Sequence, residues 1–174
     1  MSNKKKLYFP MFVDLSDKKV VVVGAGTIAK RRIRVIADFT DHLVVIAPEV
    51  NREMKEMEEA GRLTILRKNY EREDIYDAAL VIAATNDNKT NQDIYSACKC
   101  LGIAVNVCND KTRCDFYFPG IASNEHVVVG ISAGGRGHGK SRAVAEKIQE
   151  LLDDNGSSAG KGEQDQEVGD GVCL

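Results

Sequence analysis

Three small residues, Gly24, Gly26 and Ala29, have the types and spacing that most directly suggest chemistry. They follow the continuous apolar run of residues 20–23 and open a segment with helical periodicity. In that setting the first glycine permits a tight turn, the second lets the backbone approach a pyrophosphate, and the alanine lets helix and strand pack closely. Amides at the helix N-terminus would then bind the phosphates. We predict a dinucleotide-binding loop here; the plainer alternative is an ordinary strand-to-helix turn.

The acidic residue that usually ends the second strand of such a fold is displaced in this sequence. Ala47 and Pro48 occupy its place, and Glu49 comes slightly late. Glu49 could reach the adenosine ribose, or it could be a solvated residue in the first turn of a helix over 49–60, and both interpretations stay open. We predict NAD as the cofactor.

Two later segments follow apolar runs and should open onto the same edge of a sheet, where ligands bind in open α/β folds. After residues 80–84, Thr85 and Asn86 are predicted to hydrogen-bond to the cofactor, although Asn86 and Asp87 could instead cap the next helix. After residues 103–107, Asp110 is the best-placed candidate for a proton acceptor, although turn chemistry also favours an acidic residue there.

Several basic residues later in the chain suggest an anionic substrate. A solvated surface position is the alternative for each of them taken singly. These basic residues are Arg113, Arg136, His138, Lys140 and Arg142, and the first four are the predicted substrate-binding residues.

Apolar runs alternate with segments of helical periodicity, which predicts an α/β fold: a Rossmann-type, doubly wound parallel sheet with right-handed crossovers. A small β/α region should follow it, and from residue 155 the composition is polar enough to predict a disordered tail. The predicted domains are therefore an NAD-binding Rossmann domain (1–113), a small β/α dimerisation and substrate region (114–154) and the tail (155–174). Expected strands are 18–23, 43–46, 63–66, 80–84, 103–107, 116–119 and 126–131; expected helices are 28–36 (with Ile28, Val35 and Ile36 as its apolar face), 49–60, 89–101 and 141–152.

Composition narrows the class of partner. The 174 residues are 43% hydrophobic and carry a formal charge of −2, which favours neither nucleic acid nor an acidic membrane. No long apolar run follows the basic start, so we expect a cytoplasmic protein without a membrane segment. Five cysteines, an odd number without a CxxC pair, predict free thiols and no metal site.

The order of these features resembles the precorrin-2 dehydrogenase family, the amino-terminal module of sirohaem synthases and its stand-alone relatives. The resemblance covers about residues 8–152, and it depends on order and spacing rather than on any single motif. Its landmarks are Phe9-Pro10-Met11-Phe12-Val13-Asp14-Leu15, Gly24 to Arg32, Ala47-Pro48-Glu49, Ala83 to Asp87 with Asn91, Val105-Asn106-Val107, Cys114-Asp115-Phe116 with Phe118-Pro119, and Gly134-Gly135.

The resemblance implies oxidation of precorrin-2 to sirohydrochlorin, with a hydride passed to NAD. It implies cofactor contacts at Thr27, Ile28, Pro48 and Glu49, and a homodimer with the strands after Phe116 exchanged or packed between subunits. A polycarboxylate tetrapyrrole substrate would account for the basic residues.

The sequence departs from the family pattern at three places. Asn109 stands where the family has an aspartate implicated in proton removal and chelation, so Asp110 would have to substitute. Ala133 replaces a Ser or Thr, and Gly137-His138 replaces Ser-Pro. The chain also ends without the further helical domain, so iron insertion is less expected than oxidation. The alternatives are a sirohydrochlorin ferrochelatase and an NAD-binding module that regulates or no longer catalyses.

Overall fold

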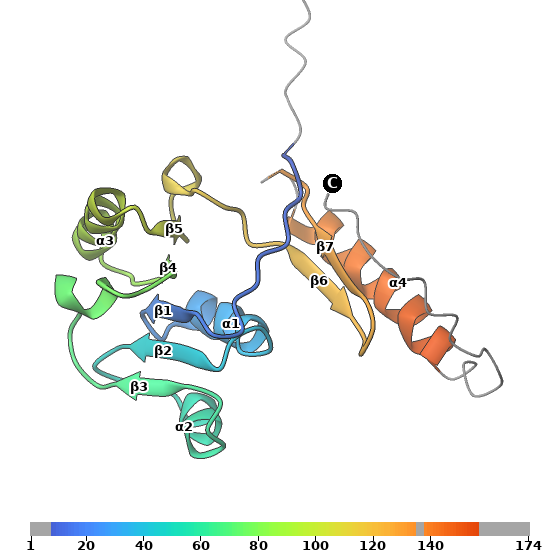
Figure 1. The fold of residues 1–174 in the computed structure, drawn as a ribbon, viewed down its shortest axis with the longest axis horizontal. Helices are drawn as coiled ribbons and strands as arrows, with labels where there is room; N and C mark the ends of the chain where they lie inside the picture. Colours follow the sequence, from blue (N-terminus) through green and yellow to red (C-terminus); the bar gives the residue numbers. More distant parts are fainter. Residues whose placement is uncertain (1–7, 135–137, 157–174) are drawn as a thin grey trace, which may run out of the picture.

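A computed structural model describes residues 8–134 and 138–156 of the chain. Its main unit is a five-stranded parallel sheet in the order β3-β2-β1-β4-β5, with helices on both faces (Figure 1). The expected α/β Rossmann fold is thereby confirmed. The elements of this unit are β1 (Lys19–Val23), α1 (Thr27–Ile36), β2 (His42–Ile46), α2 (Arg52–Glu59), β3 (Thr64–Leu66), β4 (Leu80–Ala83), α3 (Asn88–Leu101) and β5 (Ala104–Val107).

Strand β1 lies at the centre of the sheet and is buried on both faces. Val20 and Val22 pack into a core layer with residues of α1 and α2, whereas Val21 and Val23 pack into a second layer with residues of α3. Because successive side chains of a strand point to opposite faces, a run of four valines suits a strand covered by helices on both sides. This arrangement fixes the carboxyl ends of β1 and β4 side by side.

Helix α1 uses a different buried face from the one expected. Its buried residues are Ala29, Ile33 and Ile36. Ile28 is 49% exposed, and Val35 is only partly buried. The prediction that Ile28 and Val35 belong to the core face is therefore wrong, because the glycine loop sets the rotation of the helix so that Ala29 faces the sheet.

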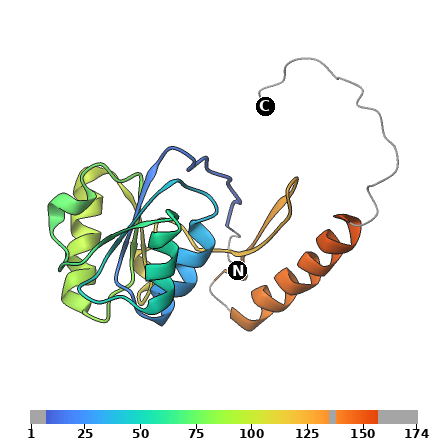
Figure 2. The same cartoon turned by 90° about the horizontal axis from the view of Figure 1, so that it is seen from below.

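The region after β5 forms an arm that projects from the sheet unit (Figures 1 and 2). Strands β6 (Gly120–Ser123) and β7 (Val128–Ile131) pair antiparallel, and α4 (His138–Gly156) packs along them. Helix α4 has 19 residues and continues past residue 155, where the tail was expected to begin. No helix in the described part of the chain is long and apolar enough to cross a membrane.

The expected strand over 116–119 is not present, and β6 instead occupies part of the predicted connection. Phe116 and Phe118 pack against the core layer beneath α1, so their alternation reflects docking onto the sheet unit rather than pairing in a second sheet. Asn106 fixes this segment by donating a hydrogen bond from Nδ2 to the Phe116 carbonyl at 2.8 Å. Pro119 has no amide hydrogen, which disfavours strand pairing there and delays β6 to Gly120.

Candidate cofactor and substrate site

The loop between β1 and α1 closely approaches the end of β4. Gly24 has φ +108°, and a Cβ built on it would lie 2.5 Å from the Ala84 carbonyl oxygen. Its amide donates to the Ile46 carbonyl at 2.8 Å, which ties the loop to β2 as well. Since α1 and α3 cover opposite faces of the sheet, this contact lies at the topological switch point, where open α/β folds bind their ligands.

The N-terminus of α1 is open beside this contact. Gly26 is the N-cap residue and offers no side chain to the first-turn amides, and the first turn contains no acidic residue. A Cβ on Gly26 would meet nothing within 4 Å, so free space lies next to these amides. Thr27 and Ile28 are exposed at the same turn. Unsatisfied amides, an exposed glycine and open space fit a dinucleotide pyrophosphate.

Pro48 and Glu49 lie in the turn that follows β2, and both are exposed. Helix α2 begins only at Arg52, and Asn51 caps it by accepting a hydrogen bond from the Met54 amide at 3.0 Å. Glu49 is therefore not in the first turn of a helix, as one interpretation of the sequence required. Its carboxylate follows the strand next to β1, which is the position from which such a fold contacts the adenosine ribose.

The turn after β4 is held by buried Asn91. The Oδ1 atom of Asn91 accepts from the Thr85 hydroxyl at 2.8 Å, and its Nδ2 donates to the Thr85 carbonyl at 3.0 Å. Asp87 caps α3 by accepting from the amides of Lys89 and Thr90, both at 3.1 Å. The capping alternative thus applies to Asp87. The exposed side chain of Asn86 makes no hydrogen bond within the described residues, which leaves it able to meet a ligand.

Asn109 and Asp110 follow β5 and have different surroundings. Asn109 joins an amide network, accepting from Asn91 Nδ2 at 3.3 Å and donating to Asn88 Oδ1 at 2.6 Å.

The Asp110 carboxylate accepts hydrogen bonds from the Thr112 amide at 2.9 Å and from the Thr112 hydroxyl at 2.6 Å. Arg113 pairs with it at 3.3 Å. The bonds from Thr112 hold the pKa of Asp110 below its usual range, so the group is ionised at neutral pH. The turn chemistry expected here is present, and the role of proton acceptor stays a prediction.

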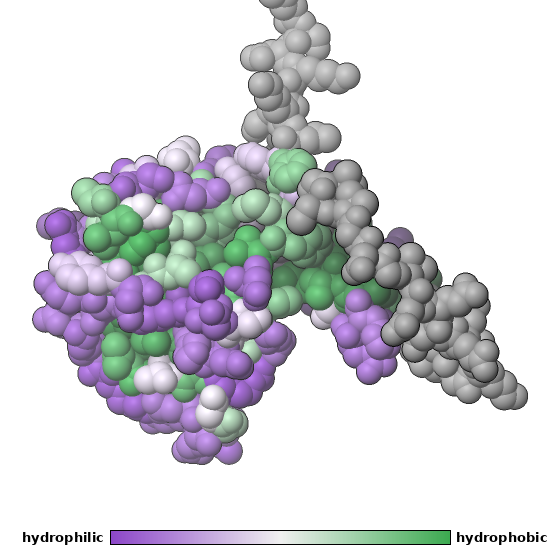
Figure 3. Space-filling view, in the orientation of Figure 1, coloured by the Kyte–Doolittle hydropathy of each residue, from purple (hydrophilic) through white to green (hydrophobic). Residues whose placement is uncertain are grey.

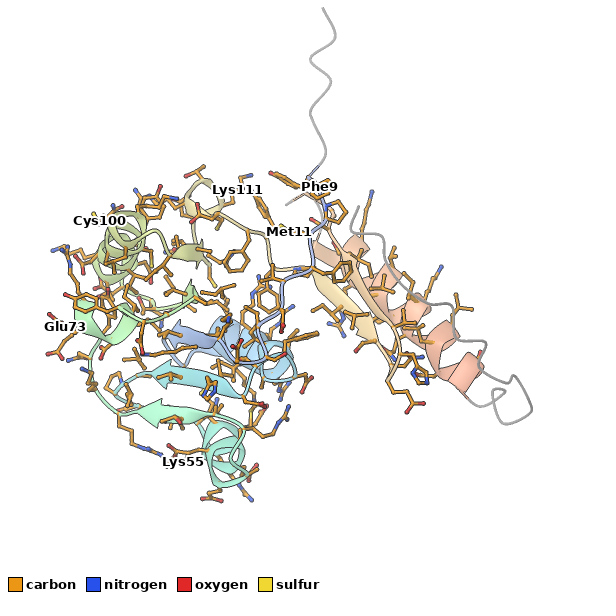
Figure 4. The ribbon with its side chains drawn as sticks, viewed as in Figure 1. Phe9, Met11, Lys55, Glu73, Cys100 and Lys111 are labelled. Atoms are coloured by element: carbon orange, nitrogen blue, oxygen red, sulfur yellow. The ribbon has the colours of Figure 1, made fainter. Side chains whose placement is uncertain are left out.

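A cleft of about 690 Å³ lies between α1, the end of β5 and the arm. Figure 3 shows hydrophobic surface at this junction, and Figure 4 labels Lys111 on the turn after β5. Ile28 lines the cleft from the first turn of α1, so the cleft begins where the glycine loop ends. The basic residues that line it are Arg31, Arg32, Lys111 and Arg142.

Two of the predicted substrate-binding residues, Arg113 and Lys140, do not line this cleft. Arg113 pairs with Asp110 and lines a separate shallow depression, while Lys140 is exposed outside the cleft. Arg136 lies outside the described residues, as does the side chain of His138. Arg142, one of the basic residues that the sequence suggested for an anionic substrate, does line the cleft, whereas Arg31, Arg32 and Lys111 were not among them. The helical spacing in α1 relative to Ile28 was the signal that could have found Arg31 and Arg32.

Comparison with known proteins gives a family match over most of the described chain. The model for a family described as "Putative NAD(P)-binding" matches residues 11–120. The "Probable multifunctional siroheme biosynthesis protein HemA" of Ruminiclostridium josui is 39% identical over 82% of this chain and 28% of that protein. The "Siroheme synthase" of Mannheimia succiniciproducens is 34% identical over 83% of this chain and 30% of its own length. The chain thus spans about a third of the curated relatives it matches.

A solved structure, "SirC, precorrin-2 dehydrogenase", shares 29% sequence identity and a TM-score of 0.62, covering 85% of this chain and 71% of that one. These matches confirm the resemblance to the precorrin-2 dehydrogenase family that the sequence indicated, and they support the expected NAD-type cofactor. Since the family model covers more than half of the residues, the chain belongs to the putative NAD(P)-binding family.

Proposed function

We propose that this chain is an NAD-dependent dehydrogenase that oxidises precorrin-2 to sirohydrochlorin. The observation that carries the proposal is the position of Ile28, which belongs both to the first turn of α1 and to the wall of the basic cleft. A cofactor held by the glycine loop would therefore adjoin a substrate in that cleft. The names of the relatives, siroheme synthase and precorrin-2 dehydrogenase, supply the substrate.

Several residues of the chain would hold and orient the cofactor. The first amides of α1, next to Gly26 and Thr27, would bind the pyrophosphate. Glu49 would accept hydrogen bonds from the ribose hydroxyls, which favours NAD over its 2′-phosphorylated form because a carboxylate repels a phosphate. Thr85 and Asn86 would contact the cofactor from the end of β4. When bound, NAD supplies the hydride acceptor for the reaction.

The oxidation also removes a proton from the substrate, and we assign that proton to the carboxylate of Asp110. Asp110 is ionised at neutral pH and lies at the same edge of the sheet as the glycine loop. Asn109 is a neutral amide and cannot take up the proton. Its hydrogen bonds to Asn88 and Asn91 suit it to fixing the turns after β4 and β5 relative to each other.

The proposal includes a homodimer formed through the arm. Exposed hydrophobic side chains occur on the amino-terminal segment, at Phe9, Met11 and Phe12, and on the arm, at Val127 and Val144. Tyr8 stacks on Tyr117 with ring centroids 4.5 Å apart, which holds the first of these stretches against the start of the arm (Figure 4 labels Phe9 and Met11). Apolar surface of this kind is typical of subunit interfaces. Sedimentation velocity of the full chain would show a dimer, and a monomer at micromolar concentration would contradict it.

The decisive experiment is anaerobic turnover of precorrin-2 by the purified full chain with NAD. The visible spectrum of the pigment and the absorbance of NADH would be followed together. We expect stoichiometric sirohydrochlorin and NADH. Measurable NAD binding without turnover would contradict the proposal and indicate a binding module. Ferrous iron added after oxidation would then test chelation as a separate activity.

Replacement of Asp110 by asparagine tests the assigned proton acceptor. The asparagine side chain can still accept the hydrogen bond from the Thr112 amide, so the turn should survive while the basic oxygen is lost. We expect the turnover number to fall about 100-fold or more, with little change in the melting temperature or in NAD affinity. An unaltered rate would remove Asp110 from the mechanism and leave it as a turn residue.

A further inference from the structure

The four basic residues of α1 divide into two pairs with different partners. Lys30 and Arg34 both form ion pairs with Glu53 of α2. Arg31 and Arg32 have no carboxylate within ion-pair distance in the described part of the chain, and both line the cleft. One side of the helix thus has a counter-ion within the protein, and the side that faces the cleft has none among the described residues.

Arg32 is the more confined of the two unpaired residues. Its guanidinium carbon lies 4.2 Å from the centroid of the Phe118 ring, and the side chain is half-buried beside Cys108. Burial lowers the pKa of Arg32, although a guanidinium stays charged at neutral pH. Keeping a cation partly out of water without a counter-ion costs free energy, which an anionic ligand in the cleft would offset.

The rest of the cleft has the same sign of charge. Arg31 and Lys111 line it without an ion-pair partner among the described residues. Glu146 is the one carboxylate in the described lining, and Arg142 already pairs with it at 2.7 Å. Hydrophobic residues such as Ile28 and Val35 form much of the remaining wall. A cleft of this composition suits a ligand with an apolar body and several negative groups.

We propose that Arg32 is a specificity-determining residue that binds a carboxylate of the substrate, with the Phe118 ring fixing the plane of its guanidinium. A guanidinium held in one plane can present two parallel N–H groups to a carboxylate, which a lysine cannot do. This inference rests on the proposed function for the identity of the ligand as a polycarboxylate tetrapyrrole. It assigns to α1 a second role, because the helix that would bind the cofactor at its N-terminus would bind the substrate one turn later.

The test compares the full-length variants Arg32→Gln and Arg34→Gln. Arg34 lies on the same helix but faces Glu53 outside the cleft, so Arg34→Gln matches the loss of charge without touching the proposed site. Binding of a porphyrin octacarboxylate would be measured by the change in porphyrin fluorescence, without NAD, and NAD affinity would be measured separately. We expect Arg32→Gln to weaken porphyrin binding about 10-fold or more, the size of one charge-assisted pair. We expect Arg34→Gln to leave it nearly unchanged.

Arg32→Lys sharpens the test, because lysine keeps the positive charge but lacks the two parallel N–H groups of the guanidinium. We expect it to recover only part of the affinity, and the difference between wild type and Arg32→Gln to shrink at high salt. Equal effects of Arg32→Gln and Arg34→Gln would overturn the assignment, since the charge alone would then matter. A parallel loss of NAD affinity would also overturn it, because Arg32 would then serve the cofactor. The absence of porphyrin binding by the wild type would overturn it as well.

The experiments distinguish a failure of the proposed carboxylate site at Arg32 from a failure of the proposed dehydrogenase function. Arg32-dependent porphyrin binding by a protein that does not oxidise precorrin-2 would support the carboxylate site and contradict the dehydrogenase. Oxidation of precorrin-2 with an unchanged KM in Arg32→Gln would do the reverse.

Discussion

Two strand-to-helix turns meet at the same edge of the sheet and treat their helix ends in opposite ways. The turn after β4 supplies its own cap, because the Asp87 carboxylate accepts hydrogen bonds from two amides of α3. The turn after β1 supplies none, because the N-cap residue of α1 is Gly26. Both helix ends carry the same unsatisfied amides and the same partial positive charge. Only one of them leaves that charge available to a ligand.

The difference leaves the N-terminus of α1 suited to an anion, because no side chain among the described residues caps its amides. Helix α2 is capped by Asn51, so α1 is the exception among the three helices of the sheet unit. A side-chain cap stabilises a helix by about 1 kcal/mol, and α1 forgoes that stabilisation. The loop before α1 also packs closely against Ala84, which places the open end of the helix beside the turn that follows β4.

The largest expected effect comes from making the open helix end resemble the capped one. In Gly26→Asp the new side chain has room, and the backbone at this position is already extended with φ −72°. The carboxylate would accept hydrogen bonds from the α1 amides and repel a pyrophosphate. A like charge at about 4 Å costs about 4 kcal/mol near a protein surface. We expect NAD affinity to fall about 1000-fold, with a melting temperature equal to or slightly above that of the wild type.

Gly26→Ala is the matched control, because it adds a Cβ into the same open space without a charge or a cap. It should lose clearly less NAD affinity than Gly26→Asp, because its methyl group occupies space beside the pyrophosphate but does not repel it electrostatically. Unchanged NAD binding by Gly26→Asp, measured by calorimetry, would remove the open helix end from the cofactor site.

The second prediction breaks the contact that joins the two turns. In Gly24→Ala the alanine backbone would have to adopt φ +108°, which residues with a side chain rarely do. Its Cβ would also collide with the Ala84 carbonyl. We expect the free energy of unfolding to fall by about 3 kcal/mol. Gly102→Ala isolates the contribution of the contact, because Gly102 also has positive φ but no atom lies within 4 Å of the position that a Cβ would take there. Urea unfolding that shows equal losses in the two variants would contradict the tight approach of Gly24 to β4.

Local sequence patterns predicted the parts of the fold that depend on local chemistry. Four consecutive valines favour a strand covered on both faces, and the helix expected over 89–101 does end at Leu101, where Gly102 follows in the left-handed conformation. The prediction of a strand over 116–119 was wrong, because alternating aromatic residues fit both a half-buried strand and a loop that packs on a core. Only the tertiary contacts of Phe116 and Phe118 distinguish these two cases.

The residues of the candidate site also differ in how far the sequence predicts them. Those of the glycine loop are consecutive in the chain, so they could be named from the sequence. The basic cleft forms between α1 and an arm almost a hundred residues further on, and no spacing in the sequence shows that Arg32 and Arg142 face the same space. Basic residues near the expected substrate region were therefore favoured, and Arg113 proved to be paired with Asp110 instead.

The smallest expected effect comes from opening the capped helix end. Asp87→Ala removes the hydrogen bonds to the α3 amides, and we expect the melting temperature to fall by about 3 °C. NAD affinity should stay within about 2-fold, because the anion site proposed here is at α1. A loss of NAD affinity as large as that of Gly26→Asp would show that the two helix ends are not functionally different.

The pH dependence of the Asp87→Ala effect identifies the capping group as a carboxylate. The hydrogen bond from the Thr90 hydroxyl, followed by those from the Lys89 and Thr90 amides, lowers the pKa of Asp87 in the folded protein. A carboxyl group whose pKa is lowered by folding stabilises the fold above its unfolded pKa, near 4, and loses that contribution as the pH falls through its folded value. The difference in melting temperature between wild type and Asp87→Ala should therefore be full at neutral pH and shrink below about pH 4.

Asp87→Asn keeps an oxygen acceptor that does not titrate, so its cap should persist at low pH. A difference that is constant from pH 7 to pH 2 would show that the ionised carboxylate is not what closes this end of the helix.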